Sequence, residues 1–239
     1  MNGELACALL AGGSVRCWGS NEHGALGDGT LLSRSSPVAV TGLTGVTAVS
    51  SSTAHTCALL ADGTVRCWGF NFWGQLGDGS TTDHLTPVPV SGLSGVMAIA
   101  AGNRHTCAVL ADRTAYCWGS NASGELGDGT TTDRYVPTPV PLEGVVAVTA
   151  GTAHSCALLA GGTVRCWGAT RGADPTAPPR LTPEPVSGLA RVVAISGFGA
   201  HTCALLDGGV VSCWGGNDAG QLGDGSRDDR VVPGDVSGL

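Results

Sequence analysis

The stretch from His55 to Gly102 reads HTCALLADGTVRCWGFNFWGQLGDGSTTDHLTPVPVSGLSGVMAIAAG and recurs, with changes, along the whole chain. Each copy carries two cysteines ten residues apart, and the second cysteine precedes a Trp-Gly pair. A repeat near 50 residues, built of short strand-like runs, predicts an all-β propeller of about five four-stranded units. The five cysteine pairs are Cys7 and Cys17, Cys57 and Cys67, Cys107 and Cys117, Cys156 and Cys166, and Cys203 and Cys213.

Each copy contains four candidate strands. His55–Leu60 and Thr64–Gly69 flank an Asp-Gly turn, and Val96–Ala100 is a run of small apolar residues. Thr86–Val90 alternates proline with other residues, and proline, which lacks an N–H, is confined to the edges of sheets. We therefore expect Thr86–Val90 to be the outermost strand and Val96–Ala100 to lie nearest the propeller axis.

The turn at Ala61–Gly63 fixes the register of the hairpin. A three-residue loop ends in a left-handed residue, a position that suits Gly63. Cys57 then faces Cys67 in a non-hydrogen-bonded pair, where side chains come closest and a disulfide is sterically feasible. The third copy has Arg113 at the left-handed position, at a cost of about 1 kcal/mol, which predicts the weakest hairpin.

The chemical state of the ten cysteines has three interpretations. Five pairs with the same spacing indicate disulfides and an oxidising compartment. Free thiols acting as small core residues are the second interpretation. A zinc site is disfavoured, because the sequence contains no C-x-x-C motif.

Composition excludes several classes of function. The chain of 239 residues is long enough for a sizeable core. It carries 12 basic residues, all arginine, against 19 acidic ones, so its net charge is −7. The absence of lysine excludes Schiff-base lysines and the lysine of a P-loop, and an acidic chain with scattered arginines is a poor nucleic-acid binder. No apolar run approaches 20 residues, so we expect no membrane insertion, and no cofactor is indicated.

The motifs of the second copy resemble those of the regulator of chromosome condensation repeat family. The motifs are His55 in His-Thr-Cys-Ala-Leu-Leu, Trp68-Gly69 followed by Asn71, the loop from Gly74 to Gly79, and Pro87 in the trailing Pro-Val-x-Val. The resemblance covers nearly the whole chain and implies a β-propeller, commonly of seven blades, that serves as a protein-interaction platform. It also implies two relatives for comparison, a nucleotide exchanger for a small GTPase and a bacterial β-lactamase inhibitor.

The copies depart from the motif in ways that bear on the ring. The first copy has Leu5 in place of the histidine, and the fourth replaces the Gly-x-Leu-Gly-Asp-Gly loop with a proline-rich insert, Arg171–Pro183. Five hairpins but only four inner-strand runs predict part of a longer propeller, acting as a monomer or within a longer chain. A closed five-bladed ring or completion by another chain is the alternative. The units are approximately 1–45, 46–95, 96–144, 145–191 and 192–239 within a single domain.

The recurring polar residues are interpreted as structural. Each histidine at the position of His55 occupies the same strand site, which is typical of a hydrogen-bonded core residue. Asp78 lies between glycines and lacks the dense carboxylates of a calcium loop, so a turn role is favoured. The sequence shows no nucleophile elbow and no paired carboxylates, and we predict neither catalytic nor metal-binding residues.

The positions that vary between copies are the candidates for partner binding. They flank the asparagine that follows Trp-Gly, and in the second copy they hold three aromatic side chains. Aromatic residues gathered at a propeller rim suit a binding hot spot, and packing on the neighbouring blade is the alternative. The candidate residues are Phe70, Phe72 and Trp73, with Glu22 and His23 in the first copy and Asp218 in the fifth.

These observations favour a non-enzymatic protein-interaction scaffold, secreted or surface-exposed in a bacterium, whose partner is another protein. The expected location is extracellular, periplasmic or at the cell surface if the cysteines are bonded, and cytoplasmic if they are reduced. The alternatives are guanine-nucleotide exchange on a small GTPase and inhibition of a secreted hydrolase such as a β-lactamase.

Overall fold

The computed structural model describes residues 5–169 and 178–239, and every regular element in these ranges is a β-strand. The strands form one three-stranded and four four-stranded antiparallel sheets, here called the first to fifth blades. The first blade holds β1 (Leu5–Leu9), β2 (Val15–Gly19) and β3 (Arg34–Ala39). The second holds β4 (Val46–Ser51), β5 (His55–Leu60), β6 (Val65–Gly69) and β7 (His84–Pro89), and the third β8 (Val96–Ala101), β9 (His105–Leu110), β10 (Ala115–Gly119) and β11 (Arg134–Val140). The fourth holds β12 (Val145–Ala150), β13 (His154–Leu159), β14 (Val164–Gly168) and β15 (Arg180–Pro185), and the fifth β16 (Val192–Phe198), β17 (His201–Leu206), β18 (Val211–Gly215) and β19 (Arg230–Asp235).

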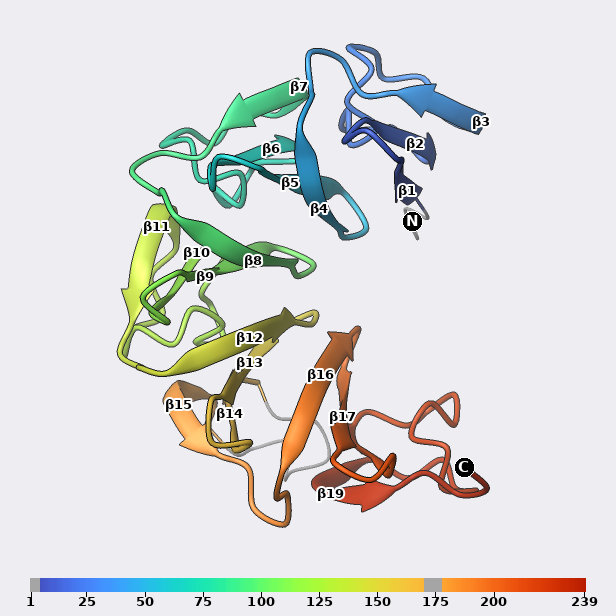
Figure 1. Cartoon of the computed structure of the whole chain (residues 1–239), viewed down its shortest axis with the longest axis vertical. Helices are drawn as coiled ribbons and strands as arrows, with labels where there is room; N and C mark the ends of the chain where they lie inside the picture. The colour runs from blue at the N-terminus through green and yellow to red at the C-terminus, as the bar shows by residue number, and fades with distance from the viewer. Residues whose placement is uncertain (1–4, 170–177) are drawn as a thin grey trace.

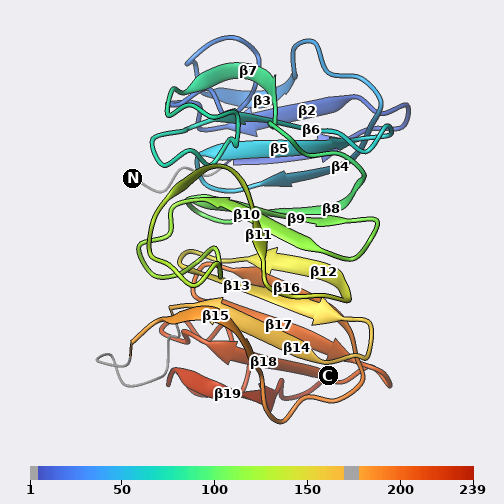
Figure 2. The same ribbon diagram turned by 90° about the vertical axis from the view of Figure 1, so that its left-hand side faces the viewer.

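The blades follow one another along an open arc (Figure 1). The first strands of the four-stranded blades, β4, β8, β12 and β16, line the inner side of the arc, and the proline-bearing strands lie on its outer side. Figure 2 shows the sheets stacked face against face. This confirms the predicted propeller and the inner and outer strand assignments.

The hairpin register is the one the turn predicted. His55 pairs with Gly69 and Cys57 with Cys67, while the Leu60 amide donates to the Thr64 carbonyl over 2.9 Å. Gly63 has a φ of 76°. Both faces of β5 are buried against neighbouring blades.

Several expected boundaries differ from those of the structure. By one residue, β6 begins at Val65 and not at Thr64, β7 ends at Pro89 and not at Val90, and β8 ends at Ala101 and not at Ala100. Two larger differences share one physical reason. The outer strand β7 begins at His84 and not at Thr86, because the ladder resumes with Gly69 opposite His84 after a register shift. In the fourth blade β15 likewise begins at Arg180, because Gly168 pairs with Arg180 after a register shift. The last four residues of the expected insert Arg171–Pro183 therefore belong to this strand. The part of that insert within 170–177 lies outside the described residues.

All five cysteine pairs are disulfides across the hairpins, and each has a Cα–Cα distance of 4.1 Å. Cys57 and Cys67 are fully buried in a cluster with Leu59, Val65 and the next blade's Trp118. The structure therefore favours the disulfide interpretation over free thiols. Every hairpin is cross-linked at the centre of its blade.

A histidine in each of the second, third and fourth blades forms a hydrogen bond with a hydroxyl of the blade that follows, whereas the first blade has Leu5 at this position. The Thr106 hydroxyl donates to the Gln75 carbonyl over 2.9 Å, so it accepts a hydrogen from the His55 Nε2, also at 2.9 Å. His105 bonds Ser155 in the same way, and His154 bonds Thr202, both over 2.8 Å. These contacts confirm the core role predicted for these three histidines.

The hydrogen-bond partner of the second ring nitrogen, Nδ1, differs between these histidines. Ser52 Oγ lies 2.9 Å from the His55 Nδ1, whereas Gly102 stands at the equivalent place in the third blade and the buried His105 Nδ1 has no partner. Burial lowers the pKa of His55 and His105 to about 3, and that of His154 to about 4. All three are therefore neutral in the folded chain above about pH 5.

We expect the protein to lose stability in mild acid. Unfolded histidine has a pKa near 6.5, so each of the three buried rings takes up a proton on unfolding once the pH falls below that value. Each contributes a slope of about 1.4 kcal/mol per pH unit between about pH 6 and the lowered folded pKa. The measurement is the unfolding free energy from urea titrations between pH 7 and 5. For His105→Gln, its dependence on pH should correspond to the uptake of one proton fewer on unfolding than in the natural chain. An unchanged slope would contradict the buried neutral ring.

The hairpin of the third blade should be improved by Arg113→Gly. Arg113 has a φ of 66°, where glycine is free of the strain that a side chain brings. The variant should gain about 0.5–1 kcal/mol in unfolding free energy, and the reverse change at the matched site, Gly63→Arg, should lose a similar amount. Thermal unfolding of both variants is the measurement, and equal midpoints for all three proteins would show that the strain is absent. Arg191, with a φ of 54°, is a second left-handed arginine that the sequence did not reveal.

Candidate functional site

A buried asparagine builds the loop that carries the aromatic side chains. The Asn71 Oδ1 accepts from the Leu76 amide over 2.9 Å, and its Nδ2 donates to the Ser80 carbonyl and to the Asp78 carboxylate. The backbone N–H of Asn71 donates to the Asp83 carboxylate over 2.8 Å. Asn21, Asn121 and Asn217 make the corresponding Oδ1 contact in the other loops of this type. The recurring letters therefore hold the loop in shape, and the turn role predicted for Asp78 is confirmed.

Asp78 anchors the far end of the same loop. Its carboxylate lies 2.8 Å from the His84 Nε2 at the start of β7 and accepts from the Ser80 amide over 3.0 Å. Burial raises the pKa of Asp78, but the hydrogen bonds from Ser80 and Asn71 outweigh it, so the pKa lies below its usual value. The carboxylate stays charged at neutral pH and ties the loop to the outer strand.

The variable residues of the second blade form one aromatic cluster, which we define as His23, Phe70, Phe72 and Trp73. The Phe70 ring lies 4.3 Å from the His23 ring and 5.3 Å from Trp73 between ring centroids. Phe72 contacts Trp73 edge-on at 5.2 Å and is 66% exposed. The structure thus brings together four of the six predicted binding residues.

Groups from both neighbouring blades hold the aromatic cluster. His23, from the first blade, has its Nδ1 2.9 Å from an Asp83 carboxylate oxygen. Arg104, from the turn between β8 and β9, places its guanidinium 4.3 Å from the centre of the Trp73 ring, within the range of a cation–π contact. The aromatic cluster together with Arg104 therefore joins three blades and has a cation at one edge.

A carboxyl group in the third blade lies close to this cation. Burial raises the pKa of Glu125, although the Ser123 amide donates to its carboxylate over 2.8 Å and the Arg104 charge acts in the opposite direction. Glu125 occupies the loop position that Gln75 holds in the second blade.

The geometry divides the aromatic residues between the two roles predicted for them. Phe70 and Trp73 are partly buried and pack on groups from the flanking blades, as the packing alternative expected. Phe72 projects outward. Glu22 is exposed beside His23, while Asp218 is exposed in the corresponding loop of the fifth blade and lies outside the aromatic cluster.

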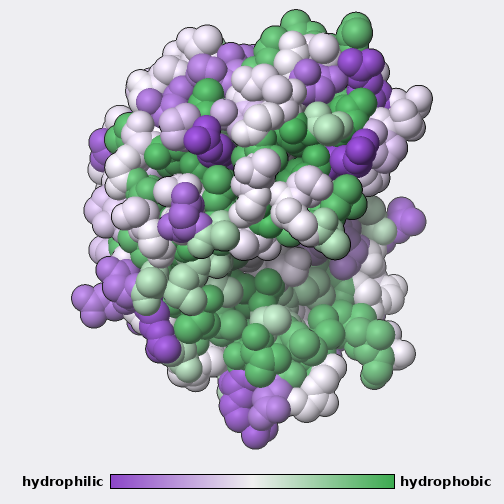
Figure 3. All heavy atoms as spheres, turned by 45° about the horizontal axis from the view of Figure 1, so that its top comes forward, coloured by the Kyte–Doolittle hydropathy of each residue, from purple (hydrophilic) through white to green (hydrophobic). Residues whose placement is uncertain are grey.

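Two members of the environment were missed from the sequence, Asp83 and Arg104. The second, third, fourth and fifth copies have Ala54, Arg104, Ala153 and Ala200 before the histidine, so Arg104 was visible as a departure from the repeat. Exposed apolar residues occur elsewhere too, as the scattered green areas of Figure 3 show, and include Met97 and Val193 on inner strands. Exposure alone therefore does not distinguish the aromatic cluster from other apolar surface. The cluster differs because its side chains are aromatic and because Asp83 and Arg104 hold them in place.

Within the described ranges, no three His, Cys, Asp or Glu side chains gather as a metal site would require. No helix in those ranges is long and apolar enough to cross a membrane.

Comparison with known proteins places this geometry in a family. Curated proteins gave no match. Among solved structures, human WBSCR16 superposes with a TM-score of 0.86 and 25% identity, over 98% of this chain and 65% of that one. Yeast RCC1 (Prp20), solved bound to Kap60, gives 0.85 and 22%, over 98% and 59%. The CRINKLY ectodomain of the Arabidopsis thaliana receptor kinase ACR4 gives 0.54 and 20%, over 96% and 63%.

This chain therefore spans less than two thirds of the length of each of these three relatives. A family model of the RCC1-like domain matches residues 2–239. With its repeated hairpins, its Asn-braced loops and its arc of blades, the chain belongs to the RCC1-like domain family.

Proposed function

We propose that the chain is a non-enzymatic protein-interaction scaffold whose partner-binding surface is centred on the aromatic cluster. The single observation that carries the proposal is Phe72, a large aromatic side chain that is 66% exposed and packs on Phe70 and Trp73 of the aromatic cluster. Aromatic side chains, phenylalanine included, are enriched in protein–protein interfaces relative to the rest of the surface. Glu22 adds a charge at the rim.

The rigid scaffold favours binding because it reduces the conformational entropy that the loop and its side chains lose when a partner binds. The loop is fixed by Asn71 and Asp78, and the rings by Asp83 and Arg104, so little ordering remains to be done when a partner binds. Folding, reinforced by a disulfide in each blade, completes that ordering in advance.

The proposal places the chain outside the cytoplasm, at a cell surface, in a periplasm or in the extracellular space. Five cross-strand disulfides are compatible with an oxidising compartment. Such a location weighs against exchange on a small GTPase, which works in a reducing compartment. Inhibition of a secreted hydrolase would be one form of the proposed protein binding, and we do not single it out.

Phe72→Ala should separate binding from packing. We expect affinity for a partner identified by cross-linking from the organism's secreted proteins to fall at least tenfold, as for a hot-spot residue. Because the ring is mostly exposed, the unfolding free energy should change by less than about 0.5 kcal/mol. Titration calorimetry and thermal unfolding give the two values.

Met97→Ala is the matched control, since Met97 is 65% exposed but lies on the inner strand β8. It should leave affinity unchanged. If Phe72→Ala and Met97→Ala have equal affinities, or if Phe72→Ala alone loses stability with binding intact, the aromatic cluster is a packing feature and the proposal fails.

A further inference from the structure

Three of the four joints between blades are closed by a leucine from the preceding blade. Leu26, Leu76 and Leu126 are each at most 1% exposed and pack against the tryptophan of the next blade. The carbonyl just before the leucine accepts two hydrogen bonds from that blade. In the second joint the Gln75 carbonyl accepts from the Trp118 Nε1 and the Thr106 hydroxyl, both over 2.9 Å.

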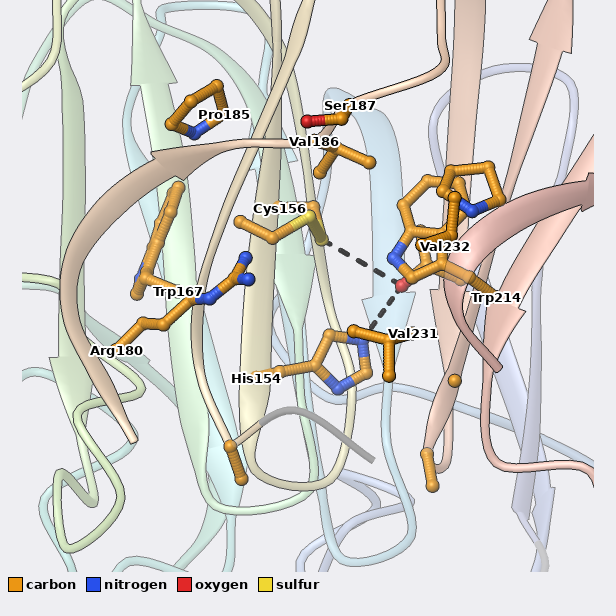
Figure 4. Close-up of a pocket in the computed structure, with 16 residues that line it drawn as sticks. His154, Cys156, Trp167, Arg180, Pro185, Val186, Ser187, Trp214, Val231 and Val232 are labelled. Carbon is orange, nitrogen blue, oxygen red and sulfur yellow. Dashed lines mark hydrogen bonds between the residues drawn. A yellow bond between two sulfur atoms is a disulfide. The ribbon is translucent and has the colours of Figure 1, made fainter. Parts of the chain in front are cut away.

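The joint between the fourth and fifth blades has no such leucine among the described residues. The core cluster there contains Trp214 and Val192 but no described residue of the loop between β14 and β15. A cavity of about 120 Å³ opens at this place, lined by Trp214, Thr202, His154, Val186 and Arg180 (Figure 4). This volume is close to that of an engineered leucine-sized cavity, about 150 Å³, which binds small apolar molecules.

Two hydrogen-bond donors converge on the cavity without the acceptor that their counterparts have. The Trp214 Nε1, on a residue 8% exposed, has no hydrogen-bond partner in the described chain. Thr202 is 1% exposed, and its hydroxyl oxygen lies 2.8 Å from the His154 Nε2 and 3.8 Å from the Cys156 sulfur. Unlike the Thr106 hydroxyl, it meets no loop carbonyl in the described chain. Figure 4 shows His154 and Cys156 directed at the same oxygen. A carbonyl placed here would satisfy both donors, as the Gln75 carbonyl does in the second joint.

Arg180 and the Val231 carbonyl also correspond to groups that bind the loop in the second joint. Asp78 pairs with His84 at the start of β7, and Arg180 holds the position of His84 in the fourth blade, where no described residue takes the place of Asp78. Among the described residues, Arg180 pairs with Glu184 on its own strand, over 2.9 Å. In the second joint the Gly79 amide also donates to the Tyr135 carbonyl over 3.0 Å, and no described loop amide bonds Val231, which holds that position in β19.

The chain's own insert offers no leucine for this cavity. Residues 170–179 read TRGADPTAPP and contain no aliphatic residue larger than proline. We propose that the joint between the fourth and fifth blades is a second binding site, which takes a Leu-Gly-Asp segment of a partner protein. The leucine fills the cavity, the preceding carbonyl accepts from Trp214 and Thr202, and the aspartate pairs with Arg180. This site is separate from the aromatic cluster.

The test uses a capped hexapeptide, GQLGDG, which is the sequence of residues 74–79. It is titrated into the full chain labelled with ¹⁵N, and the Trp214 indole signal is followed, with Trp214→Phe used for assignment. We expect a saturable shift of that signal. The peptide GQAGDG should bind at least tenfold more weakly, because the buried leucine side chain is lost. GQLGNG should bind several-fold more weakly to the natural chain and equally to Arg180→Gln.

Protein variants separate binding from folding. Trp214→Phe should weaken the peptide several-fold in calorimetry while keeping the unfolding midpoint, since its indole N–H has no partner to lose. Trp118→Phe, the matched change in a closed joint, should lower the midpoint and leave peptide affinity unchanged. Phe72→Ala should also leave peptide affinity unchanged, so the two sites can fail independently. No Trp214 shift at several millimolar peptide, or equal binding of GQLGDG and GQAGDG, overturns the proposal.

Discussion

The structure depends on one contact, made at three of the four joints between the described blades. A backbone carbonyl at the end of a loop accepts hydrogen bonds from a tryptophan and a hydroxyl of the following blade, and the adjoining leucine is sealed beneath that tryptophan. A small sheet cannot bury its two faces alone, so blades are stable only when stacked. The recurring Trp, Thr or Ser, Leu and His residues all belong to this contact.

The same constraint explains how scaffold and surface are divided. Residues that close joints or brace loops, such as Asn71 and Asp78, point inward and recur in the other copies. The positions that vary from copy to copy flank Asn71, and in the second blade they are Phe70, Phe72 and Trp73, which are partly or largely exposed. In the second blade these side chains are aromatic. Phe70 packs against His23 of the first blade, and Trp73 packs against Arg104 of the third. In the fourth blade the loop that closes the joint differs, and the Trp214 indole N–H has no acceptor in the described chain.

Much of the fold could be predicted from the sequence, because the informative features are local and repeated. The Asp-Gly turn before Thr64 determines the register, which places Cys57 against Cys67. The start of β7 at His84 could not be found in this way, because a register shift after Cys67 depends on sheet geometry and not on the alternation of residues. The contact of Arg104 with Trp73 joins residues of different blades, and a single repeat holds no information about such a pair. The loss of the fourth loop was visible in the sequence, but its consequence at Trp214 required the neighbouring blade.

The most direct test of the account is the exchange rate of the tryptophan indole hydrogens with solvent, measured by NMR on the folded chain. Trp68, Trp118 and Trp167 donate to loop carbonyls and are at most 1% exposed, so their indole hydrogens should exchange only when a joint opens. The Trp214 hydrogen, which faces a cavity, should exchange orders of magnitude faster. Exchange of Trp118 as rapid as that of Trp214 would contradict the claim that these joints hold the blades together.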